Sequence, residues 1–184
     1  MVPSLVSKKL IIVDEDDNII EYVSKKICHR GQGLLHRAFS IFIFNDQNDL
    51  LIQRRSVEKP LWPLYWSNSV CSHPRKGEEY EDAAHRRLEE ELRIKTTLKY
   101  LFKFQYHAQY KNIGSENEVC CVFIGKSDEN IQPNKSEIEE WKYINLEDLT
   151  LDLKNNSNAY TPWFKMEWDQ IRKNYNSAIS KLWE

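Results

Sequence analysis

The sequence predicts an α+β fold in a single domain that spans residues 1–184. Segments typical of β-strands precede and follow one central amphipathic helix, and a second helix is predicted near the end of the chain. The length supports one hydrophobic core and is too short for two ordinary domains. The chain has 41% apolar and 29% charged residues, with neither internal repeats nor low-complexity tracts, so nothing in it marks a second domain.

Two β-hairpins are predicted in the first third of the chain. Apolar runs at residues 10–13 and 19–23 flank an acidic turn. A second pair of strands, residues 37–44 and 50–54, is joined by a turn rich in Asn and Asp. His36 stands at the mouth of the first strand of this second pair.

The middle of the chain is predicted to hold an irregular segment, a helix and two strands. Residues 60–74 are aromatic and interrupted by proline, which indicates irregular backbone with a short extended piece at 69–73. Irregular loops often carry functional residues. Residues 78–92 lack Gly and Pro and repeat apolar side chains at helical spacing, which predicts an amphipathic helix. Strands follow at 100–110 and 119–124.

The C-terminal segment is predicted to form a helix that begins at Pro162. Thr161 belongs to the residue types that cap helices by accepting a backbone N–H bond, and proline is favoured at the first helical position. Apolar residues then recur at helical spacing, at Phe164, Trp168, Ile171, Tyr175 and Ile179. This pattern is typical of an amphipathic helix.

The overall charge narrows the classes of partner. The formal charge of −2 and the isoelectric point near 6.2 provide no field that would gather nucleic acid or an anionic membrane. We therefore expect neither nucleic acid nor membrane as a partner, and an anionic ligand would need a local basic pocket.

Cysteine usage and the start of the chain favour a cytoplasmic protein. Of the four cysteines, Cys120 and Cys121 are adjacent in a predicted strand, where neighbours point to opposite faces and rarely pair. Residues 1–9 lack an apolar segment long enough for a secretory signal, and no run approaches the roughly 20 apolar residues of a membrane span. A reducing, cytoplasmic location is expected.

Three histidines and two glutamates have the residue types of a metal site. They are His29, His36, His73, Glu116 and Glu118. Imidazole nitrogens with carboxylate oxygens suit Mn²⁺, Zn²⁺, Fe²⁺ or, with more water, Mg²⁺. Spacing alone favours another interpretation, in which the histidines are scattered on the surface and the glutamates lie at a solvated hairpin end. His85 and His107 are not expected to be ligands.

Cys71 is a candidate reactive residue. It shares a face with His73 if this piece of chain is extended. A thiol near imidazole and cations can ionise and act as a base or nucleophile. Alternatively, Cys71 is a buried apolar side chain or a ligand of a structural zinc site. The residues themselves leave these three options open.

Arg87 and Glu91 lie on one stripe of the predicted central helix, separate from its apolar stripe. They could contact a diphosphate bridged by Mg²⁺, since a carboxylate holds the ion and an arginine neutralises phosphate oxygens. The alternative is an ion pair within the helix on a solvated face. Lys25, Arg55 and Lys59 could add cationic groups to a diphosphate site.

Several short motifs occur in a characteristic order along the chain. They are LHRAFS at 35–40, RR at 54–55, WP at 62–63, WSNSVCSHP at 66–74, ENEVC at 116–120 and TPW at 161–163. Together they closely resemble type I isopentenyl-diphosphate isomerases, over roughly residues 25–163. The Asn-Ser-Val-Cys-x-His-Pro and Glu-Asn-Glu-Val segments are jointly very specific to that family.

The resemblance implies a Nudix-like α/β/α sandwich with a mixed sheet, and the central helix carries an altered Nudix signature. Glu78 and Arg86 occupy signature positions, whereas Ser72 and Arg93 replace glycines and Arg87 replaces a metal-binding glutamate. An arginine there should weaken a hydrolytic metal cluster and favour holding a diphosphate intact. This departure favours an isomerase over a Nudix diphosphate hydrolase. A non-catalytic, metal-stabilised binding module is the other alternative.

The implied activity is that of an isopentenyl-diphosphate Δ-isomerase, which interconverts isopentenyl diphosphate and dimethylallyl diphosphate in isoprenoid biosynthesis. The substrate would be a small allylic or homoallylic diphosphate. The cofactors would be Mg²⁺ with the diphosphate and one Mn²⁺ or Zn²⁺ at the His/Glu site. A monomer or weak homodimer is expected.

The resemblance also assigns a role to each candidate residue. The metal ligands would be His29, His36, His73, Glu116 and Glu118, with Glu91 holding the Mg²⁺ that accompanies the substrate. The substrate-binding residues would be Lys25, Arg55, Lys59, Arg87 and Ser72. The catalytic residues would be Cys71 and Glu118 as acid/base groups on the two faces of the substrate, Tyr106 assisting Glu118, and Trp163 beside the reacting carbons.

Overall fold

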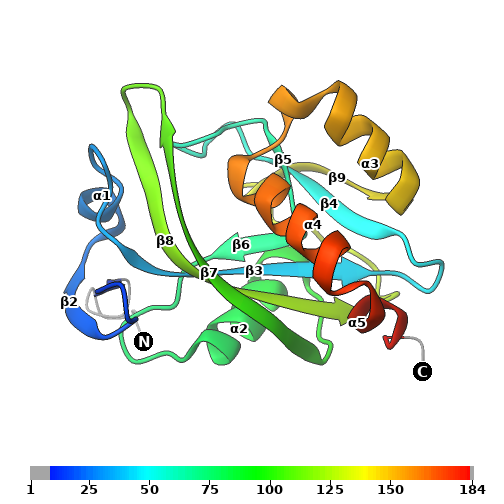
Figure 1. Ribbon diagram of the computed structural model, residues 1–184, viewed down its shortest axis with the longest axis horizontal. Helices are drawn as coiled ribbons and strands as arrows, with labels where there is room; N and C mark the ends of the chain where they lie inside the picture. Colours follow the sequence, from blue (N-terminus) through cyan, green and yellow to red (C-terminus); the bar gives the residue numbers. More distant parts are fainter. Residues whose placement is uncertain (1–8, 183–184) are drawn as a thin grey trace.

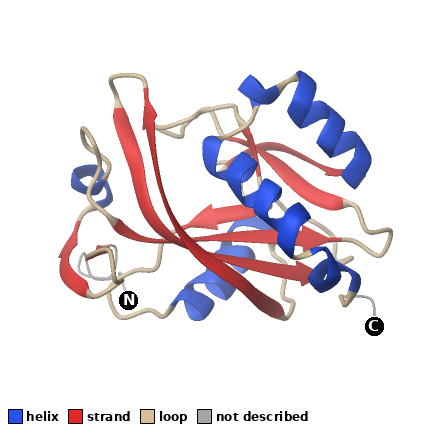
Figure 2. Ribbon diagram, viewed as in Figure 1, coloured by secondary structure: helices blue, strands red, loops and turns tan. Residues whose placement is uncertain are grey.

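The computed structural model describes residues 9–182, in which one mixed β-sheet lies between helices (Figures 1 and 2). The elements in chain order are β1 (Leu10–Val13), β2 (Ile19–Val23), α1 (Lys25–Cys28), β3 (His36–Phe44), β4 (Leu50–Arg55), β5 (Trp66–Ser67), β6 (Val70–Ser72), α2 (Tyr80–Leu92), β7 (Leu98–Tyr110), β8 (Gly114–Lys126), β9 (Ile138–Ile144), α3 (Leu146–Asn155), the 3-10 turn η2 (Ser157–Ala159), α4 (Pro162–Asn174) and α5 (Asn176–Ser180). The predicted α+β class and the α/β/α layering are confirmed.

The core occupies both faces of the central strand β3, whose side chains alternate between two apolar clusters. Phe42 and Phe44 pack on the face covered by α4. Ile41 and Ile43 pack on the opposite face, which is covered by α2. Strand β8 runs parallel to β3 in register and alternates in the same way. Burial on both faces explains why these strands appear in the sequence as nearly continuous apolar runs.

The second predicted hairpin is confirmed at its turn and wrong beyond it. Phe44 and Leu50 pair across the turn, but they are the one pair recorded between β3 and β4. Ser69 stands between the separating strands, since its Oγ accepts from Ile43 N at 2.8 Å and donates to Leu51 O at 2.6 Å. Strand β6 therefore pairs with β3, while β4 pairs with β5 and β9. This separation brings the segment around β6 into the sheet.

The ends of α2 show how the altered Nudix signature is accommodated. Glu78 precedes the helix, which begins at Tyr80. The carboxylate of Glu78 accepts hydrogen bonds from Arg86 Nε at 2.7 Å and from Arg86 Nη2 at 2.8 Å. Arg93 adopts a left-handed conformation with φ of 61° at the C-cap, where the signature has glycine. Ser72, at the other replaced glycine, lies in β6 and is not among the described residues with positive φ. Serine therefore introduces no left-handed strain there.

The C-terminal helix α4 begins at Pro162, as predicted, but its cap differs. Thr161 is the N-cap residue, as predicted, but its side chain makes no capping hydrogen bond, and its hydroxyl lies 3.0 Å from Ser67 Oγ instead. The helix ends at Asn174, and the apolar stripe continues through Ile179 of the short helix α5. The Thr161 contact holds the start of α4 against β5.

The remaining expectations concern the first hairpin, the cysteines, membrane spans and the start of the chain. The hairpin over β1 and β2 is confirmed, and all four cysteines are free thiols. Among the helices over residues 9–182, none combines the length and apolar character that a membrane span requires. The prediction that the chain start carries no secretory signal falls largely on residues 1–8, outside the described range. Location and oligomeric state remain predictions.

Candidate active site

Strand register places Glu118 between two other predicted site residues. His36 lies opposite Glu118 on the parallel strand β3, and Tyr106 lies opposite it on the antiparallel strand β7. Glu116 precedes Glu118 by two residues on β8 and therefore points to the same face of the sheet. His73 directly follows β6, which pairs with β3. The predicted cluster thus draws on four neighbouring strands.

The remaining histidine, His29, is fixed by contacts between its loop and the start of β8. Ser115 N donates to His29 O at 3.0 Å. A Cβ at Gly114 would lie 2.4 Å from His29 O, so this close approach of two backbones requires glycine. Ser115 Oγ also donates to Gly31 O at 2.7 Å. These contacts bring the imidazole of His29 over the glutamates of β8.

The five predicted ligands converge into one buried group. The group consists of His29, His36, His73, Glu116 and Glu118, and one ligand atom from each lies within 4.8 Å of all the others. His29 Nε2 lies 2.7 Å from Glu116 Oε2, and His73 Nε2 lies 2.9 Å from Glu118 Oε1. The alternative of scattered surface histidines and a solvated hairpin end is therefore wrong. The described residues place neither Cys71 nor Glu91 in this group.

The donor atoms of this group fit a divalent cation. His29 Nδ1 donates to Lys25 O and His36 Nδ1 donates to Leu34 O, each at 2.7 Å, which turns both Nε2 lone pairs toward the centre. These two Nε2 atoms and Glu116 Oε2 are buried and make no hydrogen bond in the described chain. Unpaired buried polar atoms are unfavourable, and a cation with nitrogen and oxygen ligands would satisfy all three. The buried His/Glu group has the composition of a divalent-metal site.

Both glutamates of the group are ionised. Burial opposes ionisation of Glu116, but His29 and His73 hold its pKa well below the usual range. Burial and the charge of Glu116 act to raise the pKa of Glu118, but the nearby imidazoles of His36 and His73 outweigh them, so the pKa of Glu118 is lowered. The carboxylates therefore present the charged form that metal ligands require.

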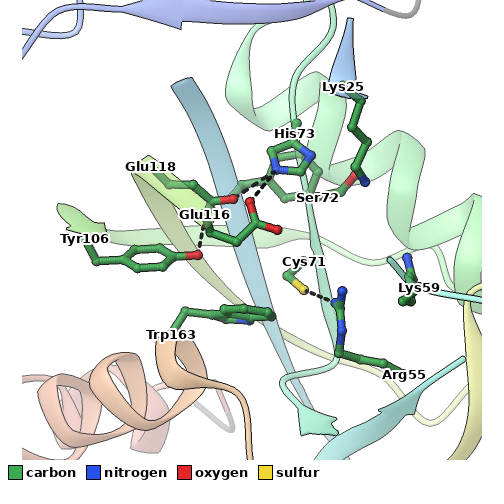
Figure 3. Close-up of a pocket in the computed structure, with 11 residues that line it drawn as sticks. Lys25, Arg55, Lys59, Cys71, Ser72, His73, Tyr106, Glu116, Glu118 and Trp163 are labelled. Atoms are coloured by element: carbon green, nitrogen blue, oxygen red, sulfur yellow. Dashed lines mark hydrogen bonds and ion pairs between the residues drawn. The ribbon is translucent and has the colours of Figure 1, made fainter. Parts of the chain in front are cut away.

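A cavity beside the buried His/Glu group brings most of the predicted site residues together (Figure 3). It is lined by Lys25, Phe39, Arg55, Lys59, Cys71, Ser72, His73, Tyr106, Glu116, Glu118 and Trp163. In this view the aromatic side chains and the glutamates lie on one side and the cations on the other, with Cys71 between them. The arrangement gives the cavity a cationic end and an aromatic wall.

Glu118 and Trp163 are both held in fixed orientations. Tyr106 OH donates to Glu118 Oε2 at 2.5 Å. The indole Nε1 of Trp163 donates to Ser67 Oγ at 3.1 Å, and its ring lies under the guanidinium of Arg55, 5.2 Å from the ring centroid. The ring faces of Trp163 are therefore placed by β5 and β4 rather than by α4 alone.

Cys71 is a neutral thiol within this cavity. Arg55 Nη1 donates to Cys71 Sγ at 3.6 Å. Burial raises the pKa of the thiol to about 11, although the charge of Arg55 opposes the rise. A thiol with this pKa holds its proton at neutral pH. Its place outside the His/Glu group makes the structural-zinc option wrong.

The predicted substrate-binding cations surround one end of the cavity. Arg55 is fixed by donation to Trp62 O at 3.0 Å and Leu61 O at 2.9 Å. Although Lys25 is exposed as a residue, desolvation of its amine at the cavity and the charges of Lys59 and Arg55 lower the pKa of this amine, which indicates that these cations are crowded. Arg87 lines an adjoining pocket that also contacts Lys25 and Ser72.

Arg87 and Glu91 form the ion pair that the sequence left as an alternative, but not on a solvated face. Glu91 is 1% exposed, and Arg87 Nη2 bonds to it. Arg87 also contacts Glu90 at 2.9 Å and Glu137 at 3.0 Å. The pair is therefore buried near the cavity, and the predicted Mg²⁺ role of Glu91 stays a prediction.

Comparisons with known proteins agree with this geometry. Residues 34–164, well over half of the chain, match the NUDIX domain family. The chain is 44% identical over 170 residues to Isopentenyl-diphosphate Delta-isomerase 1 of Photorhabdus laumondii, covering 91% of this chain and 97% of the relative. The chain belongs to the isopentenyl-diphosphate Δ-isomerase family of the Nudix superfamily. The resemblance found in the motifs is thereby confirmed.

Other members and fold neighbours extend this result. The isopentenyl-diphosphate delta-isomerase of Schizosaccharomyces pombe is 35% identical over 184 residues, covering 88% of this chain and 80% of the relative. The solved structure of the DR0079 protein of Deinococcus radiodurans superposes with a TM-score of 0.70 at 23% identity, covering 91% of this chain and 99% of that protein. At this identity the structure supports the Nudix fold alone.

Glu167 is a buried carboxyl of this isomerase fold that sequence reasoning missed. It lies on α4 one turn after Trp163 and is fully buried. Cys120 Sγ donates to Glu167 Oε1 at 3.5 Å, while Oε2 makes no hydrogen bond in the described chain. Burial, with a smaller contribution from the charge of Glu118, raises the pKa of Glu167 to about 8. No helical-periodicity signal separates such a glutamate from an exposed one.

We expect Glu167 to make the stability of the metal-free protein depend on pH. Its pKa rises from 4.5 to about 8 on folding, so the folded state binds the proton more tightly than the unfolded state. The stabilisation is complete below about pH 4.5 and is lost as the pH rises through about 8, by at most roughly 5 kcal/mol. Urea unfolding at pH 5 to 9 should show this slope, and Glu167→Gln should remove it. An equal slope in the variant would assign the effect to other groups.

Proposed function

We propose that this protein interconverts isopentenyl diphosphate and dimethylallyl diphosphate. One observation carries the proposal: Cys71 and Glu118 line a single cavity that has an aromatic wall and a cationic end. Moving a double bond along a three-carbon unit adds a proton at one carbon and removes one at another. Two acid/base groups on one bound substrate meet that requirement.

Cys71 and Glu118 would exchange protons with the two ends of the allylic unit. One group delivers a proton to the alkene and the other removes a proton, and the reverse reaction exchanges their tasks. The hydrogen bond from Tyr106 keeps the Glu118 carboxyl in a fixed orientation. The clamp on the diphosphate would hold the hydrocarbon between the two groups, which replaces random encounters by a fixed geometry.

Trp163 would stabilise the positive charge that develops when an alkene is protonated. The face of an aromatic ring attracts a cation by about 2 kcal/mol when water is absent. Trp163 is 3% exposed, and Trp62 packs against it with ring centroids 5.2 Å apart. Exclusion of water also protects a carbocation from being quenched.

The cofactors proposed are two kinds of divalent ion. His29, His36, His73, Glu116 and Glu118 would hold Mn²⁺ or Zn²⁺, whose charge would help to set the acidity of Glu118. Glu91 would hold the Mg²⁺ that accompanies the diphosphate. The diphosphate itself would contact Lys25, Arg55, Lys59, Arg87 and Ser72.

The second candidate function is a Nudix-type diphosphate hydrolase, and Arg87 argues against it. This position carries a metal-binding carboxylate in the hydrolase signature, and here its guanidinium contacts three carboxylates, those of Glu90, Glu91 and Glu137. A reversed charge removes one ligand from a hydrolytic cluster and provides a contact for phosphate oxygens.

Incubation with isopentenyl diphosphate and Mg²⁺ in deuterated water tests the proposed function directly. The metal-loaded protein should yield dimethylallyl diphosphate that carries solvent deuterium, without release of phosphate or pyrophosphate. Product and label are identified by NMR and mass spectrometry. A hydrolase would release phosphate or a monophosphate in step with substrate loss, and a binding module would leave the substrate unchanged and unlabelled.

A further inference from the structure

Two of the cations proposed for the diphosphate meet on one carboxylate, that of Glu137. Lys59 lies in the loop after β4, Arg87 lies on α2, and Glu137 directly precedes β9. Lys59 Nζ bonds to Glu137 Oε2, and Arg87 Nη2 lies 3.0 Å from Glu137 Oε1. Each oxygen of the Glu137 carboxylate thus contacts a cation from a different segment of the chain.

The backbone around Glu137 is held to the same loop that carries Lys59. The carbonyl of Glu137 accepts from Ser56 N at 2.9 Å, and Lys59 N donates to Ser56 O at 3.1 Å. The side chain of Glu137 is 21% exposed, and those of Lys59 and Arg87 are 14% and 13% exposed. This is a partly buried bridge with backbone support, which differs from an exposed surface ion pair.

Arg87 retains a donor that the protein does not satisfy. Its Nη1 donates to Glu90, and its Nη2 bonds to Glu91 and Glu137. Its Nε is buried and makes no hydrogen bond in the described chain. A buried, unpaired donor beside a cavity is unfavourable until a ligand oxygen accepts from it. The three carboxylates therefore orient the guanidinium and occupy three of its five N–H donors, which leaves the Nε–H and one Nη1–H without a partner among these carboxylates.

We propose that Glu137 is a positioning residue, which holds Lys59 and Arg87 in place for the diphosphate. This inference rests on the proposed function, since it takes the diphosphate as the ligand of both cations. Lysine and arginine side chains lose considerable rotamer freedom when they bind a ligand. A carboxylate that orders both cations in the free protein removes part of that loss at the binding step.

The charge of Glu137 is consistent with this task. Burial opposes its ionisation, but Lys59 and Arg87 lower the pKa of the carboxyl to about 2. The bridge therefore persists throughout the neutral pH range.

Two other roles for Glu137 predict different experimental outcomes. A purely structural ion pair would change stability and not diphosphate affinity, and a carboxylate that merely competes with phosphate would strengthen diphosphate binding when removed.

The test compares Glu137→Gln with Glu140→Gln in the metal-loaded protein. Glu140 lies on β9 and pairs with Arg54 at 2.6 Å, but its side chain is 51% exposed and this pair lies outside the lining of the site. We expect Glu137→Gln to raise KM about tenfold or more with kcat within about twofold. Titration with inorganic pyrophosphate and Mg²⁺ should show the same loss of affinity. Glu140→Gln should leave both quantities unchanged.

A double-mutant cycle with Arg87→Ala separates positioning from independent effects. Removing the charge-assisted contact of Arg87 should itself weaken pyrophosphate binding about tenfold to a hundredfold, and Glu137→Gln should add less in that background. Glu137→Asp, with a shorter side chain, should fall between the wild type and Glu137→Gln. Unchanged or tighter pyrophosphate binding by Glu137→Gln would overturn the inference. A wild type that binds pyrophosphate but forms no isomer would instead refute the proposed function.

Discussion

Exhaustive removal of divalent metal is expected to abolish isomerase turnover and to lower the melting temperature of the protein. The buried group of three histidines and two glutamates fits one cation, and three of its donor atoms have no hydrogen bond in the described chain. A cation that binds only the folded state stabilises it, so its loss should lower the melting temperature by about 5 °C or more. Mn²⁺ or Zn²⁺, added with Mg²⁺, should restore both properties.

Matched histidine variants show whether this effect belongs to the proposed ligands. His36→Ala should reduce the amount of metal bound per chain, measured by elemental analysis, because His36 is fully buried in the group. His107→Ala should bind metal normally, since His107 Nε2 lies 2.9 Å from Gln32 O on the surface, outside the group. Full activity in a preparation verified to be free of metal would contradict the proposal.

The sequence predicted the residues of the site better than the strands that assemble it. Residue types and the family resemblance identified all five members of the His/Glu group, yet the parallel pairing of β3 with β8 was not predicted. That pairing depends on a crossover of many residues, whereas the predicted hairpins rest on local turns. Ser69 shows the same limit, because its hydroxyl separates β3 from β4 through contacts 18 and 26 residues away in the chain.

Three elements and two carboxylates could not be predicted from the sequence pattern. Strand β9 has mostly exposed, charged side chains, so the alternation typical of a half-buried strand is absent. Helix α3 buries one residue, Leu149, and α1 has four residues. Glu137 and Glu167 acquire their environments from distant segments, and composition cannot distinguish them from surface glutamates. The structure is needed wherever a role depends on long-range contacts.

The role of Arg87 becomes clear only when the sequence and the structure are considered together. The sequence identified it as an exchange of a metal-binding glutamate for a cation. The structure adds that three carboxylates contact this cation, including that of Glu137, which precedes β9 and is distant from Arg87 in the sequence. The reversed charge therefore did not simply delete a metal ligand. It places a partly buried, oriented guanidinium beside the cavity, with its Nε–H unpaired in the described chain.

The two acid/base groups of the reaction, Cys71 and the proposed metal ligand Glu118, should produce large losses of turnover when either is substituted. Cys71→Ala and Glu118→Gln should each lower kcat by about a hundredfold or more, the scale expected for positioned proton donors and acceptors. Substrate affinity should change much less, because neither side chain is among the proposed contacts of the diphosphate. Cys121→Ala is the matched control, since this buried thiol lies on the opposite face of the sheet, in the cluster under α2.

Deuterium exchange adds a readout that distinguishes chemistry from packing. If Cys71 serves one face of the substrate, Cys71→Ala should suppress solvent exchange at one carbon position more strongly than at the other, and Glu118→Gln should show the opposite preference. Tyr106→Phe should resemble a weaker form of Glu118→Gln, because it removes only the hydrogen bond at Glu118 Oε2. Near-native turnover in Cys71→Ala would return this thiol to a packing role, and a second proton carrier would then have to be sought among the groups that line the cavity.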